Sequence, residues 1–148
     1  MINNMNFRNE TEIQCFLYSN LESMQKLIKD IIKTIYNVEV EEQEIEYVGV
    51  EYCIPTNCNA HWARGRKRID ILYEVRNIFI PIEIKTYASP DALSQVERYS
   101  QELEDFFGKK SLCGVIGERI SKSAKQAIEN ENHSFWIELG TRTYGVCK

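Results

Sequence analysis

The stretch that decides the fold is residues 69–85, IDILYEVRNIFIPIEIK. Its two halves, 69–75 and 78–85, are rich in isoleucine, valine and aromatic residues, which favour strands. Only Arg76 and Asn77 separate the halves, and asparagine tolerates the positive φ that a two-residue hairpin turn requires. The stretch therefore predicts an antiparallel hairpin with a tight turn.

A two-residue turn also sets the register of this hairpin, because Val75 must then face Ile78. Counting outward from the turn, Asp70 faces Glu83, and Lys85 lies on the same face as Glu83 because side chains alternate along a strand. The opposite face is apolar, so we expect one face to be core and the other to be a site. The apolar face comprises Ile71, Tyr73, Val75, Ile78, Ile80, Ile82 and Ile84.

The facing carboxylates of Asp70 and Glu83 need a physical reason, because like charges directly opposite in an antiparallel pair destabilise it. A divalent cation supplies that reason, and hard oxygen ligands with room for water suit Mg²⁺, or Mn²⁺ in its place. Lys85 beside them is suited to orient or deprotonate a water, or to stabilise charge on a phosphate oxygen. The alternative is an exposed hairpin that carries ordinary surface charges.

The chain before the hairpin predicts helix and then strand. From Asn9 to Tyr36 apolar residues recur with helical spacing, which indicates one long helix, or two with a break near Asn20. Asn9 is the predicted N-cap, which places glutamates in the first helical turn. Residues 44–53 alternate in the manner of a strand, and residues 53–67 have loop composition.

The chain after the hairpin predicts helix, strand, helix and strand. Ser89 and Pro90 are a typical helix start, and the amphipathic pattern runs to Phe107 before Gly108 ends it. An antiparallel hairpin followed by strand–helix–strand connections indicates an α/β fold with a central mixed sheet and helices on both faces. The remaining predicted elements are a strand over 112–116, a helix capped by Ser121 and a strand over 135–139.

Length and composition limit the class of protein. A chain of 148 residues with 43% hydrophobic residues predicts a single domain over residues 1–148. Without a long apolar run, it is expected to be intracellular and not membrane-bound, with its five cysteines as free thiols. The net charge of −4 argues against coating of nucleic acid by charge alone.

A local basic run, Arg64-Gly65-Arg66-Lys67-Arg68, precedes the hairpin. Such a run is suited to hold a phosphate backbone, and solvated loop charge is the alternative. Arg64, Arg66, Lys67 and Arg68 are therefore candidate contacts to DNA. Nearby, Cys53, Cys58 and His61 have near-usable spacing for zinc, but three candidate ligands do not make a closed structural site.

The order of these motifs resembles a known superfamily. Asp70 followed thirteen residues later by Glu83-Ile84-Lys85 resembles the PD-(D/E)XK nuclease motif, although Ile69 replaces its proline. The run Gln95 to Tyr99 resembles the Gln-x-x-x-Tyr element of the RecB-like branch. Residues 9–13 resemble the first helix of NucS/EndoMS-type DNA endonuclease catalytic domains, and the similarity spans about residues 10–139.

The resemblance implies a restriction-endonuclease-like core and a set of site residues. Asp70 and Glu83 would ligate Mg²⁺ (or Mn²⁺), Lys85 would serve the water, and Gln95 and Glu10 would complete the catalytic set. Glu12 and Glu22 are alternatives to Glu10, since a glutamate in a first helical turn is favoured by the helix dipole whatever its function. Tyr99 lies one turn after Gln95 on the same helix face and joins the predicted DNA contacts.

The predicted function is a metal-dependent nuclease that hydrolyses DNA phosphodiester bonds, with DNA as partner. Two alternatives stay open: a dimeric endonuclease of the Holliday-junction resolvase type, and a catalytically weak relative that only binds nucleic acid. Acyl transfer and nucleotide triphosphate use have no support, because the sequence contains neither a nucleophile elbow nor a glycine-rich phosphate loop. The NucS-type DNA-binding and dimerisation domain lies outside the similarity, so mismatch specificity is not implied.

Overall fold

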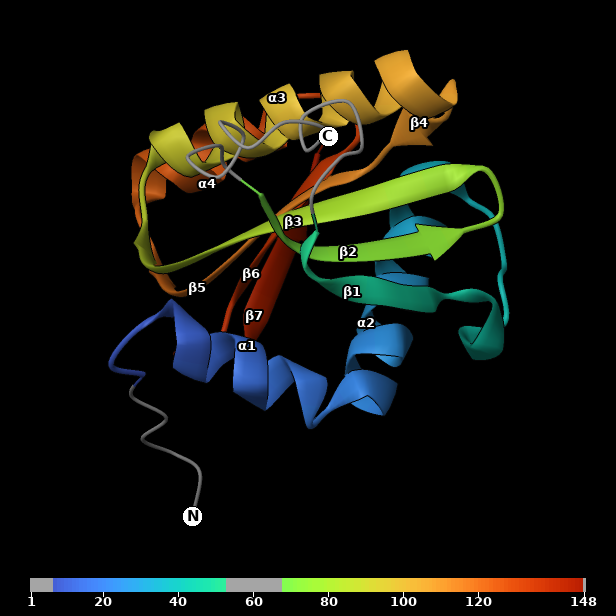
Figure 1. The fold of residues 1–148 in the computed structure, drawn as a ribbon. Coiled ribbons are helices and arrows are strands. Elements are labelled where there is room, and N and C mark those ends of the chain that lie inside the picture. Colours follow the sequence, from blue (N-terminus) through green and yellow to red (C-terminus); the bar gives the residue numbers. More distant parts are fainter. Residues whose placement is uncertain (1–6, 53–67, 148) are drawn as a thin grey trace, which may run out of the picture.

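The structure is a computed structural model that describes residues 7–52 and 68–147 (Figure 1). Its helices are α1 (Glu10–Tyr18), α2 (Leu21–Tyr36), the short 3₁₀ helix η1 (Glu42–Glu44), α3 (Pro90–Phe107) and α4 (Lys122–Glu129). Its strands are β1 (Glu46–Tyr52), β2 (Ile69–Val75), β3 (Ile78–Ala88), β4 (Lys110–Ser111), β5 (Cys113–Ile120), β6 (Ser134–Glu138) and β7 (Thr143–Val146).

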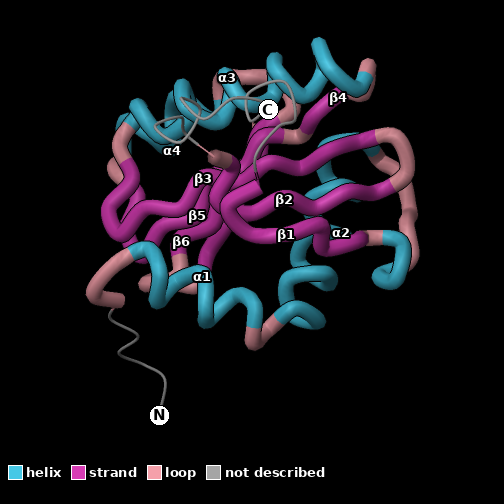
Figure 2. The backbone as a smooth tube through the Cα atoms, in the orientation of Figure 1, coloured by secondary structure: helices cyan, strands magenta, loops and turns pink. Residues whose placement is uncertain are grey.

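The described strands form one mixed sheet between two layers of helices. The order along the sheet is β1-β2-β3-β5-β6-β7, with β4 paired to β3. The β3–β5 and β5–β6 pairs are parallel, whereas the β1–β2, β2–β3 and β6–β7 pairs are antiparallel. Figures 1 and 2 show α1 and α2 on one face of the sheet and α3 and α4 on the other. The predicted α/β class, a mixed sheet flanked by helices on both faces, is confirmed.

The hairpin has the predicted register. Val75 pairs with Ile78 and Ile71 pairs with Ile82, so the loop contains two residues. The positive φ lies at Arg76 (52°) and not at Asn77, where the sequence placed it. The Arg76 side chain bonds back to the Glu44 carboxylate at 2.8 Å, which ties the turn to η1.

The apolar face of the hairpin is core, as predicted. Its side chains pack with those of α1 and α2 in one hydrophobic cluster, in which Ile28, Ile31, Tyr73 and Ile82 are fully buried. The other face of the sheet is covered by α3 and α4 through residues such as Val96. The break predicted near Asn20 is present between α1 and α2, and Asn9 caps α1 by accepting a hydrogen bond from the Glu12 amide.

Several strands differ from their predicted extent. β3 continues to Ala88 and β5 to Ile120, because these strands pair with each other over their carboxyl-terminal halves. β4 and β7 were not predicted, since two and four residues are too short to show an alternating pattern. None of the helices in the described ranges is both long and apolar enough to cross a membrane.

Gly114 on β5 has no room for a side chain. A Cβ atom built there would lie 2.3 Å from Cζ of the fully buried Phe135. Because the Phe135 ring has no free space to enter, Gly114→Ala is expected to lower the free energy of unfolding by about 2–3 kcal/mol. Urea unfolding followed by circular dichroism would measure this. Gly49→Ala is the matched control, since a Cβ there meets nothing within 4 Å, and equal losses in both variants would contradict the packing argument.

Candidate active site

The candidate site lies at a fork between two strands. β3 pairs with β2 as far as Ile71–Ile82 and with β5 from Ile82–Gly114 onward, so β3 leaves β2 after Ile82. Asp70 and Glu83 are the next residues outward on the two strands. The predicted facing pair therefore stands just beyond the last paired residues, where the ladder has opened.

The Asp70 carboxylate fills this opening. Its Oδ2 accepts a hydrogen bond of 2.7 Å from the Ile84 amide, beyond the last β2–β3 pair at Ile71–Ile82. Burial raises the pKa of the Asp70 carboxyl group above its usual value, and the charge of Glu10 acts in the same direction. The Ile84 amide, the charge of Lys85 and a hydrogen bond with the Glu83 side chain oppose this rise. Asp70 and Glu83 are thus close enough for each to influence the ionisation of the other.

Lys85 lies between the carboxylate of Glu83 and the solvent. Its Nζ lies 3.6 Å from Glu83 Oε2, and the Glu83 side chain is 7% exposed whereas that of Lys85 is 37% exposed. The ammonium group of Lys85 is thus paired with a buried carboxylate and also accessible from the surface, where it can attract an anion.

Glu10 is the N-terminal glutamate that the fold brings to this site. From the first turn of α1, its Oε2 accepts a hydrogen bond of 3.2 Å from the Thr86 amide, next to Lys85. Glu12 instead forms an ion pair of 2.6 Å with Arg8. The structure thus separates two of the three predicted glutamates: Glu10 reaches β3, and Glu12 pairs within its own segment.

A hollow of about 290 Å³ opens beside Asp70. Of the residues that line it, the sequence predicted Asp70 and Glu10 as catalytic residues and Arg68 as a DNA contact, but it gave no prediction for Glu51. Glu51 lies between Val50 and Tyr52, which pair with residues on either side of Asp70, and its backbone has a positive φ of 48°. An alternating strand pattern gives no signal for such a position. The lining residues are Glu10, Thr11, Gln14, Glu51, Arg68 and Asp70.

Tyr99 lies beneath the carboxylates rather than at the surface. It is 4% exposed, and burial together with the charges of Glu83 and Asp70 raises the pKa of its hydroxyl. This burial is at odds with the predicted contact of Tyr99 with DNA, and it indicates a supporting role under the site. Gln95 lies one turn earlier on α3 and is half-buried.

The donor set at the fork fits a hard divalent cation. Within residues 7–52 and 68–147, no group of three or more His, Cys, Asp or Glu side chains is arranged to hold a metal ion. Two neighbouring carboxylates, Asp70 and Glu83, nevertheless match the way Mg²⁺ binds, through one or two carboxylates with water and substrate phosphate as the other ligands. The raised pKa of Asp70 shows that the site disfavours its own negative charge, which a cation would offset.

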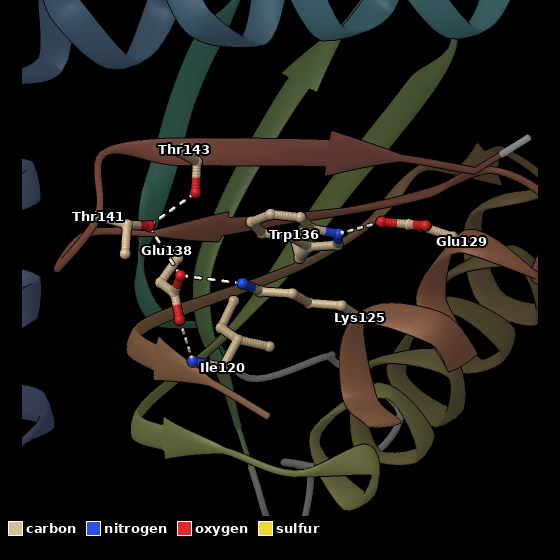
Figure 3. A network of polar contacts seen from close by, with 7 residues as sticks. All are labelled: Ile120, Lys125, Glu129, Trp136, Glu138, Thr141 and Thr143. Carbon is tan, nitrogen blue, oxygen red and sulfur yellow. Dashed lines mark hydrogen bonds and ion pairs between the residues drawn. The ribbon is translucent and has the colours of Figure 1, made fainter. Parts of the chain in front are cut away.

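Glu138 on β6 is a second carboxylate inside the protein, and unlike Asp70 it is surrounded by hydrogen-bond donors (Figure 3). Its Oε2 accepts from the Ile120 amide at 2.7 Å, and its Oε1 accepts from Lys125 Nζ at 3.0 Å and from the Thr141 hydroxyl at 2.7 Å. Burial alone would raise the pKa of the Glu138 carboxyl group, but the three hydrogen-bond donors together outweigh burial. The pKa of Glu138 is therefore lowered. Glu138 therefore holds β5, α4 and β6 together as a structural anion, unlike Asp70.

Several predicted residues lie outside the described part of the chain. These are Arg64, Arg66 and Lys67 of the basic run, together with Cys53, Cys58 and His61 of the weak zinc motif. Arg68 is described, is exposed and borders the hollow beside Asp70.

The described cysteines are thiols of very different accessibility. Cys15 is exposed, whereas Cys113 is buried and burial raises the pKa of its thiol to about 12. Because the thiolate is the reactive form, Cys113 is expected to resist alkylation by iodoacetamide at pH 8 while Cys15 reacts. Peptide mass spectrometry after timed labelling would check this, and equal labelling of both cysteines in the folded protein would contradict the burial of Cys113.

No family model and no curated protein matches this chain. Among solved structures, a repair endonuclease from Pyrococcus abyssi is similar with a TM-score of 0.51 and 19% identity, over 76% of this chain and 45% of that chain. The EndoMS–dsDNA2 complex is similar with a TM-score of 0.49 and 20% identity, over 80% and 44%. The chain thus spans less than half the length of either structure. The likeness to the Pyrococcus abyssi enzyme is one of fold, and it confirms the endonuclease-like fold that the motifs indicated.

Proposed function

We propose that this chain is a divalent-metal-dependent nuclease that hydrolyses DNA phosphodiester bonds. The observation that carries the proposal is that Asp70 and Glu83 are neighbours at the β2–β3 fork, where Asp70 accepts from the Ile84 amide and Lys85 lies 3.6 Å from Glu83. A buried carboxylate beside a half-buried one whose pKa is raised, with a cationic side chain next to them, is typical of a functional site rather than of a surface ion pair. The fold shared with a repair endonuclease supports the same reading.

Asp70 and Glu83 would hold Mg²⁺ or Mn²⁺. When bound there, such an ion lowers the pKa of water and offsets charge on phosphate oxygens. Lys85 would orient the attacking water and donate hydrogen bonds to the phosphate as negative charge builds on it. Water then adds to phosphorus as the bond to the leaving oxygen breaks, and that oxygen gains a proton. Glu10 and the Ile84 amide keep β3 and Asp70 in position through their hydrogen bonds.

The test is a cleavage assay of the purified protein on end-labelled DNA. The panel contains single-stranded, duplex, flap and four-way-junction substrates, each with Mg²⁺, with Mn²⁺ and with EDTA. Cleavage of at least one substrate with either ion, and none with EDTA, is expected. Binding without cleavage over the whole panel would contradict the proposal and favour a catalytically weak DNA-binding protein.

The same panel addresses the resolvase-type alternative. Selective cleavage of the four-way junction, together with a dimer mass by light scattering, would assign the chain to that class of nuclease. Cleavage of unbranched substrates by a monomer would exclude it.

A further inference from the structure

The carboxyl end of β3 carries an exposed aromatic side chain next to the candidate site. Tyr87 follows Lys85 by two residues and is 62% exposed. Two residues along a strand span about 7 Å, so the backbone at Tyr87 lies close to that of Lys85. The Glu10–Thr86 hydrogen bond fixes the residue between them. The exposure of Tyr87 excludes packing in the core.

An arginine stands beside this ring on the neighbouring strand. Tyr87 on β3 pairs with Arg119 on β5, and in-register residues of parallel strands point to the same side of the sheet. Arg119 is exposed, and its guanidinium group forms no ion pair with any part of the chain that the structure describes. A single exposed aromatic residue is ordinary. An exposed aromatic paired with a free cation beside a nuclease-like site has the composition of a nucleotide-binding surface.

We propose that Tyr87 and Arg119 form a platform for the nucleotide that flanks the scissile phosphate. The Tyr87 ring stacks on the base, and the Arg119 guanidinium contacts the phosphate of the same nucleotide. This inference rests on the proposed nuclease function and adds to it two substrate-binding residues. Because a ring can stack only on a base with a free face, that nucleotide must be unpaired or displaced from the duplex stack.

Fluorescence of single-stranded oligonucleotides that carry 2-aminopurine at successive positions tests the platform. The measurement is made in EDTA, so that binding is read without cleavage. Stacking on Tyr87 should quench one position in the wild-type protein. Tyr87→Ala should abolish this quenching and weaken binding roughly 10-fold, whereas Tyr87→Phe should retain both, since base–aromatic stacking contributes about 1–3 kcal/mol. The matched control is Tyr144→Ala on β7, a tyrosine that is 39% exposed and distant in the sheet order.

Salt dependence tests the arginine separately. Arg119→Ala should reduce the slope of log Kd against log salt by about 1, and Arg119→Lys should restore the slope, since one phosphate contact releases about one counterion. Lys26→Ala on α2, which also removes one exposed positive charge, should leave the slope unchanged.

The outcomes separate the platform from the nuclease. Wild-type protein that cleaves DNA while Tyr87→Ala binds, quenches and cleaves identically would overturn the platform and leave the nuclease proposal standing. Wild-type protein that quenches 2-aminopurine through Tyr87 but cleaves nothing would support the platform and overturn the nuclease proposal. Failure of the wild type to bind any oligonucleotide would overturn the platform.

Discussion

Asp70→Asn is expected to lower the rate of DNA cleavage on the order of 10³-fold, and Lys85→Ala by a similar factor. The first change removes one of the two carboxylate charges that meet at the fork. The second removes the cation that lies 3.6 Å from Glu83. Single-turnover cleavage of the preferred substrate, with excess protein and saturating Mg²⁺, would measure both losses without interference from product release.

These losses must occur in folded proteins. Asparagine at position 70 can still accept the hydrogen bond from the Ile84 amide, and it removes a half-buried carboxyl group whose pKa is raised. The melting temperature of Asp70→Asn in EDTA should therefore equal or exceed that of the wild type. Lys26→Ala is a matched control for Lys85→Ala, because it removes a lysine on α2 and should leave the rate unchanged. Cleavage by Asp70→Asn within about tenfold of the wild type would contradict the assigned role.

The largest loss of stability is expected from Glu138→Ala, at about 3 kcal/mol in the free energy of unfolding. The change leaves the buried Ile120 amide without its acceptor and removes the partner of Lys125. An unsatisfied buried donor costs about 1–3 kcal/mol and the loss of a buried ion-pair partner about 3–5 kcal/mol. Lys125 is 28% exposed and can turn toward solvent, so the expected loss is smaller than these two costs added together. Urea unfolding would measure the change.

The contribution of Glu138 depends on pH in a defined direction. Its pKa is lowered in the folded protein from an ordinary value of 4.5. Its stabilisation is thus fully present above about pH 5 and is lost as the pH falls through the lowered folded value. Glu138→Gln should accordingly show a shallower loss of stability in acid than the wild type. The exposed Glu46→Ala on β1 serves as control, and a Glu138→Ala change below about 0.5 kcal/mol, the range of ordinary surface substitutions, would refute the anchoring role.

The hairpin and its flanking helices were predictable because local rules determine them. The spacing between Val75 and Ile78 allows only a two-residue turn, and that turn sets every pair as far as Ile71–Ile82. The helix that starts at Pro90 and ends before Gly108 also follows from its terminal residues, since Gly108 has the left-handed conformation with φ 71°. In both cases neighbouring residues carry all the information.

The fork itself was not predictable, because it arises from contacts between distant segments. The β2–β3 pairing ends at Ile71–Ile82 while the pairing of β3 with β5 continues to Ala88, and no local pattern indicates where the first ladder stops. The approach of Glu10 to Thr86 depends on how α1 packs beneath the sheet, and the position of Glu51 opposite Asp70 depends on a strained residue in an edge strand. The candidate residues Asp70, Glu83 and Lys85 could therefore be proposed from sequence, whereas the positions of Ile84, Tyr99 and Glu51 around them required the fold.

The most direct test of the account is the rate of single-turnover cleavage as a function of Mn²⁺ concentration, compared between the wild-type protein and Glu83→Gln. If Asp70 and Glu83 together hold the catalytic ion, the wild-type rate saturates, and the Glu83→Gln rate stays at least about 100-fold lower and does not saturate in the same range. A Glu83→Gln protein whose cleavage rate saturates at the wild-type value and at the wild-type Mn²⁺ concentration would contradict this account.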